Sequence, residues 1–260
     1  MAARAMWKAV VTIGEIKVPV KLYSAIQDRD VHFRLLHAAD HAPVKQAMVN
    51  SDTEEVVPKE SIRRGFFARE GDLVVLKEEE LELLEPEPSR EIRLLHFFPP
   101  EVIDHRWYRR PYYLGPDGAN AKYAALIRAL ADSRREGLAQ WVMRNKSYIG
   151  ALRLNRGYPL LMALRHAEEV VSIETIKTPT GRELDQRELS MARQLIDMLA
   201  ADFEPEQYRD EYRERVMELI QTKASGGRVT AIEPRRKARS DDLSKALEAS
   251  LRKGKELKRA

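Results

Sequence analysis

Short apolar runs, separated by glycine and proline, constrain the fold of this chain more than any other feature. Many of them alternate apolar and polar residues, which is the pattern of a β-strand with one buried face. Several short strands at close spacing are typical of a β-barrel or a β-sandwich. The runs that predict strands cover residues 9–13, 18–23, 32–37, 44–49, 66–69, 73–76, 91–98, 111–118, 138–154 and 159–166.

Three further segments repeat apolar residues every three or four positions, which predicts amphipathic helices at 119–131, 189–199 and 205–223. The mixture of strands and helices predicts an α+β fold. The chain has 260 residues and no cysteine, which excludes disulfides, a thiolate zinc site and a cysteine nucleophile. No apolar run approaches the roughly 18 residues that a membrane span needs, and no secretory signal is visible. We therefore expect a soluble, cytoplasmic protein.

The positive charge is concentrated in the middle of the chain. Residues 106–166 carry 12 basic and 3 acidic side chains, a net charge of +9, whereas the whole chain has a net charge of only +4. A folded segment with this excess repels itself unless a polyanion neutralises it, which favours nucleic acid as the partner. The alternative is a basic face that pairs with the acidic flanks at residues 1–105 and 167–230, each of net charge −5.

The sequence contains few residue patterns that indicate catalytic chemistry. No phosphate-binding glycine loop, dinucleotide fingerprint, zinc-protease motif or nucleophile elbow occurs. His32, His37 and His41 are possible zinc-ligand types, but surface or packing roles explain their spacing better. Asp117 lies in a Gly-Pro-Asp-Gly turn and has no second carboxylate nearby. We therefore predict a binding protein with no catalytic residues, no metal and no cofactor.

The order of several segments is similar to one known family. The segments that carry this similarity are Trp7 with Gly14, then Val18–Ala25, His32–Ala38, Ser89–Ile92, Tyr112–Asp117, Val142–Arg153, Gln194–Leu199, Asp202–Tyr208 and Tyr212–Glu214. Together they resemble the bacterial Ku proteins of non-homologous end joining, over about residues 6–226. Many relatives carry a C-x-x-C pair in the region that matches Gln46–Val57, and this chain has none.

The resemblance implies a fold and a function. The implied fold is an antiparallel β-barrel core with a long bridge and a C-terminal helical arm, in a dimer that forms a ring. We accordingly predict a core at 1–226, with the basic bridge at about 106–166 and the arm at about 185–224. The predicted basic tail is 227–260, with a short amphipathic helix at 240–252. The implied protein has no enzymatic activity; it encircles double-stranded DNA ends, recruits the ATP-dependent multifunctional DNA ligase of the pathway, and lies in the cytoplasm with the nucleoid.

The candidate DNA contacts are the basic residues of the central segment. If that segment is the bridge, two copies bring about 18 positive charges, close to the roughly 20 phosphates of one duplex turn. The pool of predicted phosphate contacts is Arg106, Arg109, Arg110, Arg128, Arg134, Arg135, Arg144, Lys146, Arg153 and Arg156. Leu243, Leu247 and Leu251 form the apolar face of the predicted tail helix, and this face either docks on the body of the protein or contacts a partner protein. Two alternatives stay open: a duplex-DNA nuclease that uses Asp117, and an RNA-binding accessory protein.

Overall fold

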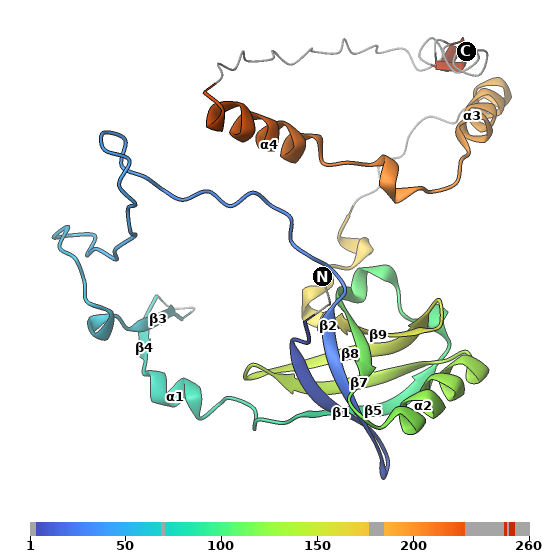
Figure 1. Cartoon of the computed structure of the whole chain (residues 1–260), viewed down its shortest axis with the longest axis horizontal. Coiled ribbons are helices and arrows are strands. Elements are labelled where there is room, and N and C mark those ends of the chain that lie inside the picture. The colour runs from blue at the N-terminus through green and yellow to red at the C-terminus, as the bar shows by residue number, and fades with distance from the viewer. Residues whose placement is uncertain (1–3, 69–70, 177–184, 227–246, 249, 253–260) are drawn as a thin grey trace. The chain divides into compact units, whose positions relative to one another are not determined.

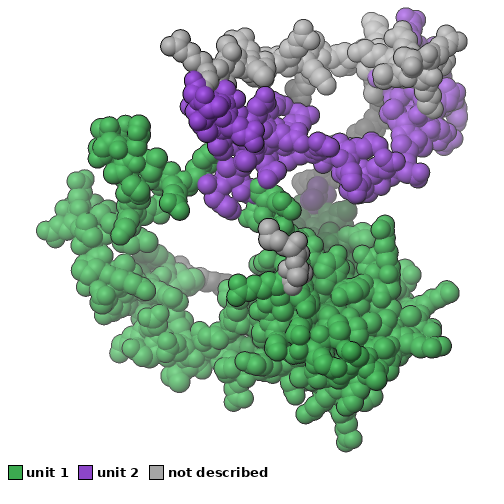
Figure 2. Space-filling view, viewed as in Figure 1, with its two compact units in different colours: residues 1–29, 33–175 green, residues 30–32, 176–260 purple. Residues whose placement is uncertain are grey.

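The computed structural model describes residues 4–68, 71–176, 185–226, 247–248 and 250–252. The chain divides into two compact units, which Figure 2 colours separately. The first unit is formed by residues 1–29 and 33–175, and the second by residues 30–32 and 176–260. The division near residue 175 falls inside the segment predicted as one core at 1–226.

The first unit contains a closed seven-stranded β-barrel (Figure 1). Its strands are β1 (Trp7–Ile13), β2 (Ile16–Ser24), β5 (Glu91–Phe98), β6 (Tyr108–Pro116), β7 (Glu136–Met143), β8 (Lys146–Asn155) and β9 (Tyr158–Leu164). Their order around the barrel is β1-β2-β6-β9-β8-β7-β5, and the pairing of β1 with β5 closes it. That pairing is parallel, and the other six are antiparallel. The predicted α+β class and barrel are confirmed.

Apolar side chains at alternate positions along the strands fill the barrel interior. Leu22, Ile92 and Leu161 are completely buried, and Trp141 is 2% exposed, so the barrel encloses one continuous apolar core. Helix α2 (Asn120–Ser133) adds its apolar face to the same core. The Tyr123 hydroxyl, on that face, donates a 2.6 Å hydrogen bond to the Leu114 carbonyl of β6.

The prediction that residues 106–166 form the bridge is wrong. They contain four of the seven barrel strands, β6 to β9, together with α2. Their alternating apolar residues pair into the barrel wall: Ala139 lies opposite Gly150, and Leu152 opposite Leu161. A segment whose strands form the wall of the barrel cannot also be an extension from the barrel.

The long excursion from the barrel is instead residues 25–90, between the end of β2 and the start of β5. Its described residues form the hairpin of β3 (Arg64–Phe67) and β4 (Leu73–Leu76), the short helix α1 (Glu78–Glu82) and one 3₁₀ turn at Lys59–Ser61. The strands predicted at 32–37 and 44–49 do not form; each segment contributes to one isolated bridge, Leu36 with Pro43 and Val49 with Val56. None of the described residues in 26–90 is buried. Without a packed face opposite them, these runs have no core to alternate against.

The second unit contains helices α3 (Gln186–Leu199) and α4 (Glu211–Ala224), within the range predicted for the arm. Side-chain caps begin both: the Asp185 carboxylate accepts from the Glu188 N–H at 2.8 Å, and Asp210 accepts from the Arg213 N–H at 2.9 Å. The helix predicted from residue 205 begins only at Glu211, after a single 3₁₀ turn.

The predicted tail helix falls mainly outside the described residues, and so does Leu243. Leu247 and Leu251 are helical and half-buried. Among the described residues, no helix is long and apolar enough to cross a membrane.

Candidate nucleic-acid interface

The strand register places most of the predicted DNA-contacting residues at two opposite ends of the barrel. At one end, Arg109 and Arg110 lie near the start of β6, and Lys146 starts β8 just after Arg144. The opposite end, where β7 begins and β8 finishes, holds the unpaired Arg134, Arg135 and Arg156. Consecutive basic residues along the chain therefore do not form one cluster in space.

Tight turns hold several of these arginines. Arg144 and Asn145 join β7 to β8 with φ of 53° and 58°. Arg156 and Gly157 join β8 to β9 with φ of 49° and 80°. Positive φ at both central residues is the requirement of the two-residue turn whose twist matches a hairpin. The turns thus place both arginines at hairpin tips, with their side chains beyond the sheet.

Ion pairs divide the ten candidates into two groups. Four have a carboxylate partner: Arg106 with Asp104 (2.8 Å), Arg109 with Glu169 (3.5 Å), Arg128 with Asp132 (3.9 Å) and Arg153 with Glu136 (3.0 Å). The other six have no carboxylate within 4.0 Å in the described part of the chain; they are Arg110, Arg134, Arg135, Arg144, Lys146 and Arg156. Their charge is available to an anion at no cost in broken ion pairs.

Arg153 is a structural residue rather than a surface cation. Its Nε lies 3.0 Å from Oε1 of Glu136, which is 2% exposed, and the Tyr108 hydroxyl donates to Oε2 at 3.2 Å. Burial raises the pKa of Glu136, and the Arg153 charge opposes that rise. Without Arg153, Glu136 would be a buried charge lacking its counter-ion.

Asp117, the carboxylate of the nuclease alternative, is held between two lysines. Its Oδ1 lies 2.9 Å from Nζ of Lys21, and its Oδ2 lies 3.4 Å from Nζ of Lys8. The hydrogen bond from Lys21 keeps the pKa of Asp117 below its usual range. These contacts tie β1, β2 and the end of β6 together. Among the described residues, no group of three histidine, aspartate or glutamate side chains could hold a metal ion.

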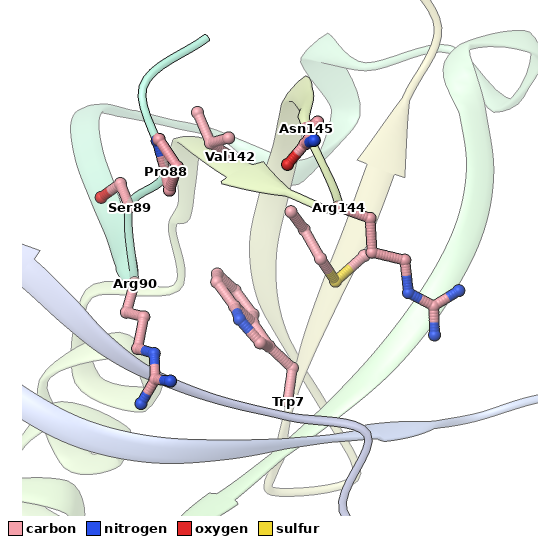
Figure 3. Close-up of a pocket in the computed structure, with 8 residues that line it drawn as sticks. Trp7, Pro88, Ser89, Arg90, Val142, Arg144 and Asn145 are labelled. Carbon is pink, nitrogen blue, oxygen red and sulfur yellow. The ribbon is translucent and has the colours of Figure 1, made fainter. Parts of the chain in front are cut away.

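A small cavity lies beside the β7–β8 turn. It has a volume of about 250 Å³ and is lined by Trp7, by Pro88 to Arg90 and by Val142 to Asn145. In Figure 3 the Trp7 ring stands in the cavity, and the side chains of Arg90 and Arg144 extend outward on either side of it. The charge count missed Arg90, because it lies outside the basic segment. Only the pairing of β5 with β7, Ile92 opposite Trp141, brings it to the same cavity as Arg144.

The fold and these side chains define a cationic β-barrel protein. The family model described as "Ku70/Ku80 beta-barrel domain" matches residues 12–191. The chain belongs to the Ku family.

Curated relatives match over almost the whole chain. The non-homologous end joining protein Ku 2 of Geotalea uraniireducens is 34% identical over 97% of this chain and 99% of its own length. The corresponding protein of Anaeromyxobacter sp. is 36% identical over 98% and 88%, and that of Mycolicibacterium smegmatis 33% over 88% and 74%. Among solved structures, the SPOC domain of human PHD-finger protein 3 has a TM-score of 0.30 and 9% identity, over 62% of this chain and 97% of that domain, which is too distant to add to the assignment.

Proposed function

We propose that this protein binds double-stranded DNA ends without sequence specificity in non-homologous end joining, and that it acts as a binding protein rather than an enzyme. Its curated relatives are named for that pathway. The observation that carries the proposal is the set of six unpaired cations on the barrel. Contacts from such cations to phosphates fix the position of a duplex without reading its bases, which suits a protein that accepts any broken end.

The charge of a dimer fits this role. Two copies offer about 12 unpaired cations, compared with roughly 20 phosphates in one turn of duplex. The paired arginines add less, because each phosphate would have to displace a carboxylate.

We further propose that the functional form is a homodimer that encircles the duplex, and that residues 25–90 are its bridge. Large apolar side chains of this segment are open to solvent: Phe33 is 67% exposed, Met48 70%, Phe67 72% and Leu83 85%. Apolar exposure on this scale marks a surface that another chain covers. A second copy is the partner that a ring requires.

A binding experiment with linear and circular DNA tests the proposal. Purified protein should shift a linear duplex in a gel at concentrations that leave the same DNA, covalently closed, unshifted. If linear DNA is loaded and its two ends are then blocked with streptavidin, the protein should stay bound in a high-salt wash, because a ring cannot leave a blocked duplex. Equal binding to the closed circle, or release from the blocked DNA by salt, contradicts encirclement.

The proposed protein partner is the ATP-dependent multifunctional DNA ligase of the pathway. The apolar face of the tail, Leu243 with Leu247 and Leu251, is the proposed contact, and the basic residues around it would add DNA affinity. The setting that we propose is the cytoplasm, on the nucleoid. No described residue set favours the nuclease or the RNA-binding alternative over this function.

A further inference from the structure

A second, larger cavity lies at the end of the barrel where β6 and β8 begin. It has a volume of about 460 Å³, and its lining includes Arg109, Arg110, Tyr112, Lys146, Ser147 and Tyr148. Cavities of this size hold small organic ligands, and the open ends of β-barrels are common places for them. The cavity lies entirely within the first unit.

Positive charge dominates the lining. Glu169 is the carboxylate of the cavity, and it is already engaged: it lies 3.5 Å from Arg109 and accepts a 2.9 Å hydrogen bond from the His166 N–H. Arg110 and Lys146 have no carboxylate partner in the described part of the chain. One cation of the cavity is thus neutralised, and two are not.

Polar and aromatic groups complete the wall. Tyr112 is 4% exposed, and the Arg110 guanidinium lies 5.8 Å from its ring centre. Burial raises the pKa of the Tyr112 hydroxyl, and the charges of Arg110, Arg144 and Arg109 oppose that rise. That hydroxyl makes no hydrogen bond among the described residues and is a neutral donor at pH 7. Ser147 adds a second hydroxyl.

We propose that this cavity binds a phosphate monoester, with Arg110 and Lys146 as its charged contacts and the hydroxyl of Tyr112 as a donor. A monoester carries close to two negative charges at pH 7 and three strong acceptor oxygens, which matches two unpaired cations beside hydroxyl donors. A backbone phosphodiester carries one charge and is a poorer match. The half-buried ring of Tyr148 gives an organic group a surface to lie against.

Two sources could supply that chemistry: a free mononucleotide, or the 5′-terminal phosphate of a DNA end. The proposal goes beyond the proposed function, because the free ligand needs neither DNA nor a second copy. A negative result for the phosphate monoester site is therefore distinguishable from a negative result for DNA encirclement.

Calorimetric titration with adenosine 5′-monophosphate and with adenosine, at constant ionic strength, tests the site. The intact protein should bind the nucleotide and not the nucleoside. Lys146→Gln and Arg110→Gln should each weaken nucleotide binding at least tenfold, and Tyr112→Phe a few-fold. Arg128→Gln is the matched control, because it removes one positive charge from α2, outside the cavity. It should bind the nucleotide as the unmodified protein does.

A second measurement separates the sources. Blunt duplexes with a 5′-phosphate and with a 5′-hydroxyl are compared for binding, with and without the nucleotide as a competitor. A preference for the 5′-phosphate that the nucleotide abolishes assigns the cavity to DNA ends, and nucleotide binding without that preference assigns it to a free ligand. Equal binding of nucleotide and nucleoside, the same loss in the Arg128→Gln control, or no binding of either probe would overturn the proposal.

Discussion

The division between paired and unpaired cations leads to a quantitative prediction about salt. Each phosphate contact lowers the logarithm of the DNA-binding constant by about 0.9 per unit of log salt concentration. A triple substitution removes six cations from a dimer. If all six contact phosphate, the slope becomes shallower by about 5.

Three charge-matched triple variants make the comparison, each removing three positive charges per chain. Asparagine replaces arginine where φ is positive, because asparagine tolerates that conformation, and glutamine is used elsewhere. The first set is Arg110→Gln, Arg144→Asn and Lys146→Gln. The second set is Arg134→Asn, Arg135→Gln and Arg156→Asn. The third set, the paired control, is Arg106→Gln, Arg109→Gln and Arg128→Gln.

Fluorescence anisotropy with a short duplex, from about 50 to 200 mM salt, gives the slope for each protein. At least one of the two sets of unpaired cations should make the slope shallower by several units. The control set should make it shallower by less than half as much. The set with the larger effect identifies the end of the barrel that faces DNA. If the control set loses as much slope as both unpaired sets, the ion pairs do not govern phosphate contact and the reasoning fails.

Three further predictions concern the barrel and the tail. Gly150→Ala should cost roughly 1–3 kcal/mol in urea unfolding, because its Cβ would lie 2.6 Å from the Trp141 ring and 2.5 Å from a backbone carbonyl oxygen; unchanged stability would contradict the packing. The raised pKa of Glu136 penalises its charged form in the fold, so Glu136→Gln should gain stability over the unmodified protein at pH 7 and lose that advantage as the pH falls through the raised pKa. If urea unfolding shows the same stability difference between Glu136→Gln and the unmodified protein at every pH, the prediction is contradicted. Deleting residues 231–260 should weaken DNA binding and abolish ligase stimulation, and two unchanged measurements would remove both roles of the tail.

The barrel could be predicted from the sequence because its strands alternate against a common core. The segments 91–98 and 138–154 have that alternation, and they became β5, β7 and β8. The runs at 32–37 and 44–49 look similar in sequence, but a strand needs a neighbour and a buried face as well as a pattern. Neither is available to these two runs, so each of them contributes only to an isolated bridge.

The candidate site was less predictable, because a charge count along the chain contains no register. The count found the basic residues but could not tell Arg153, which neutralises a buried carboxylate, from Arg156 three positions later at a hairpin tip. It also missed Arg90, which joins the site only through the pairing of β5 with β7. Ion pairs such as Arg109 with Glu169 join residues sixty positions apart, beyond any local pattern.

The bridge was misplaced for a related reason, and the correction changes how DNA binding is to be measured. If the basic segment were a bridge, its whole excess charge could face one duplex. As barrel wall, it offers three unpaired cations at each end. A duplex that contacts one end of each barrel in a dimer meets about 6 of them, which gives a salt slope near −5, whereas contact with both ends gives about −11. The slope of the unmodified protein therefore separates the two arrangements before any residue is changed.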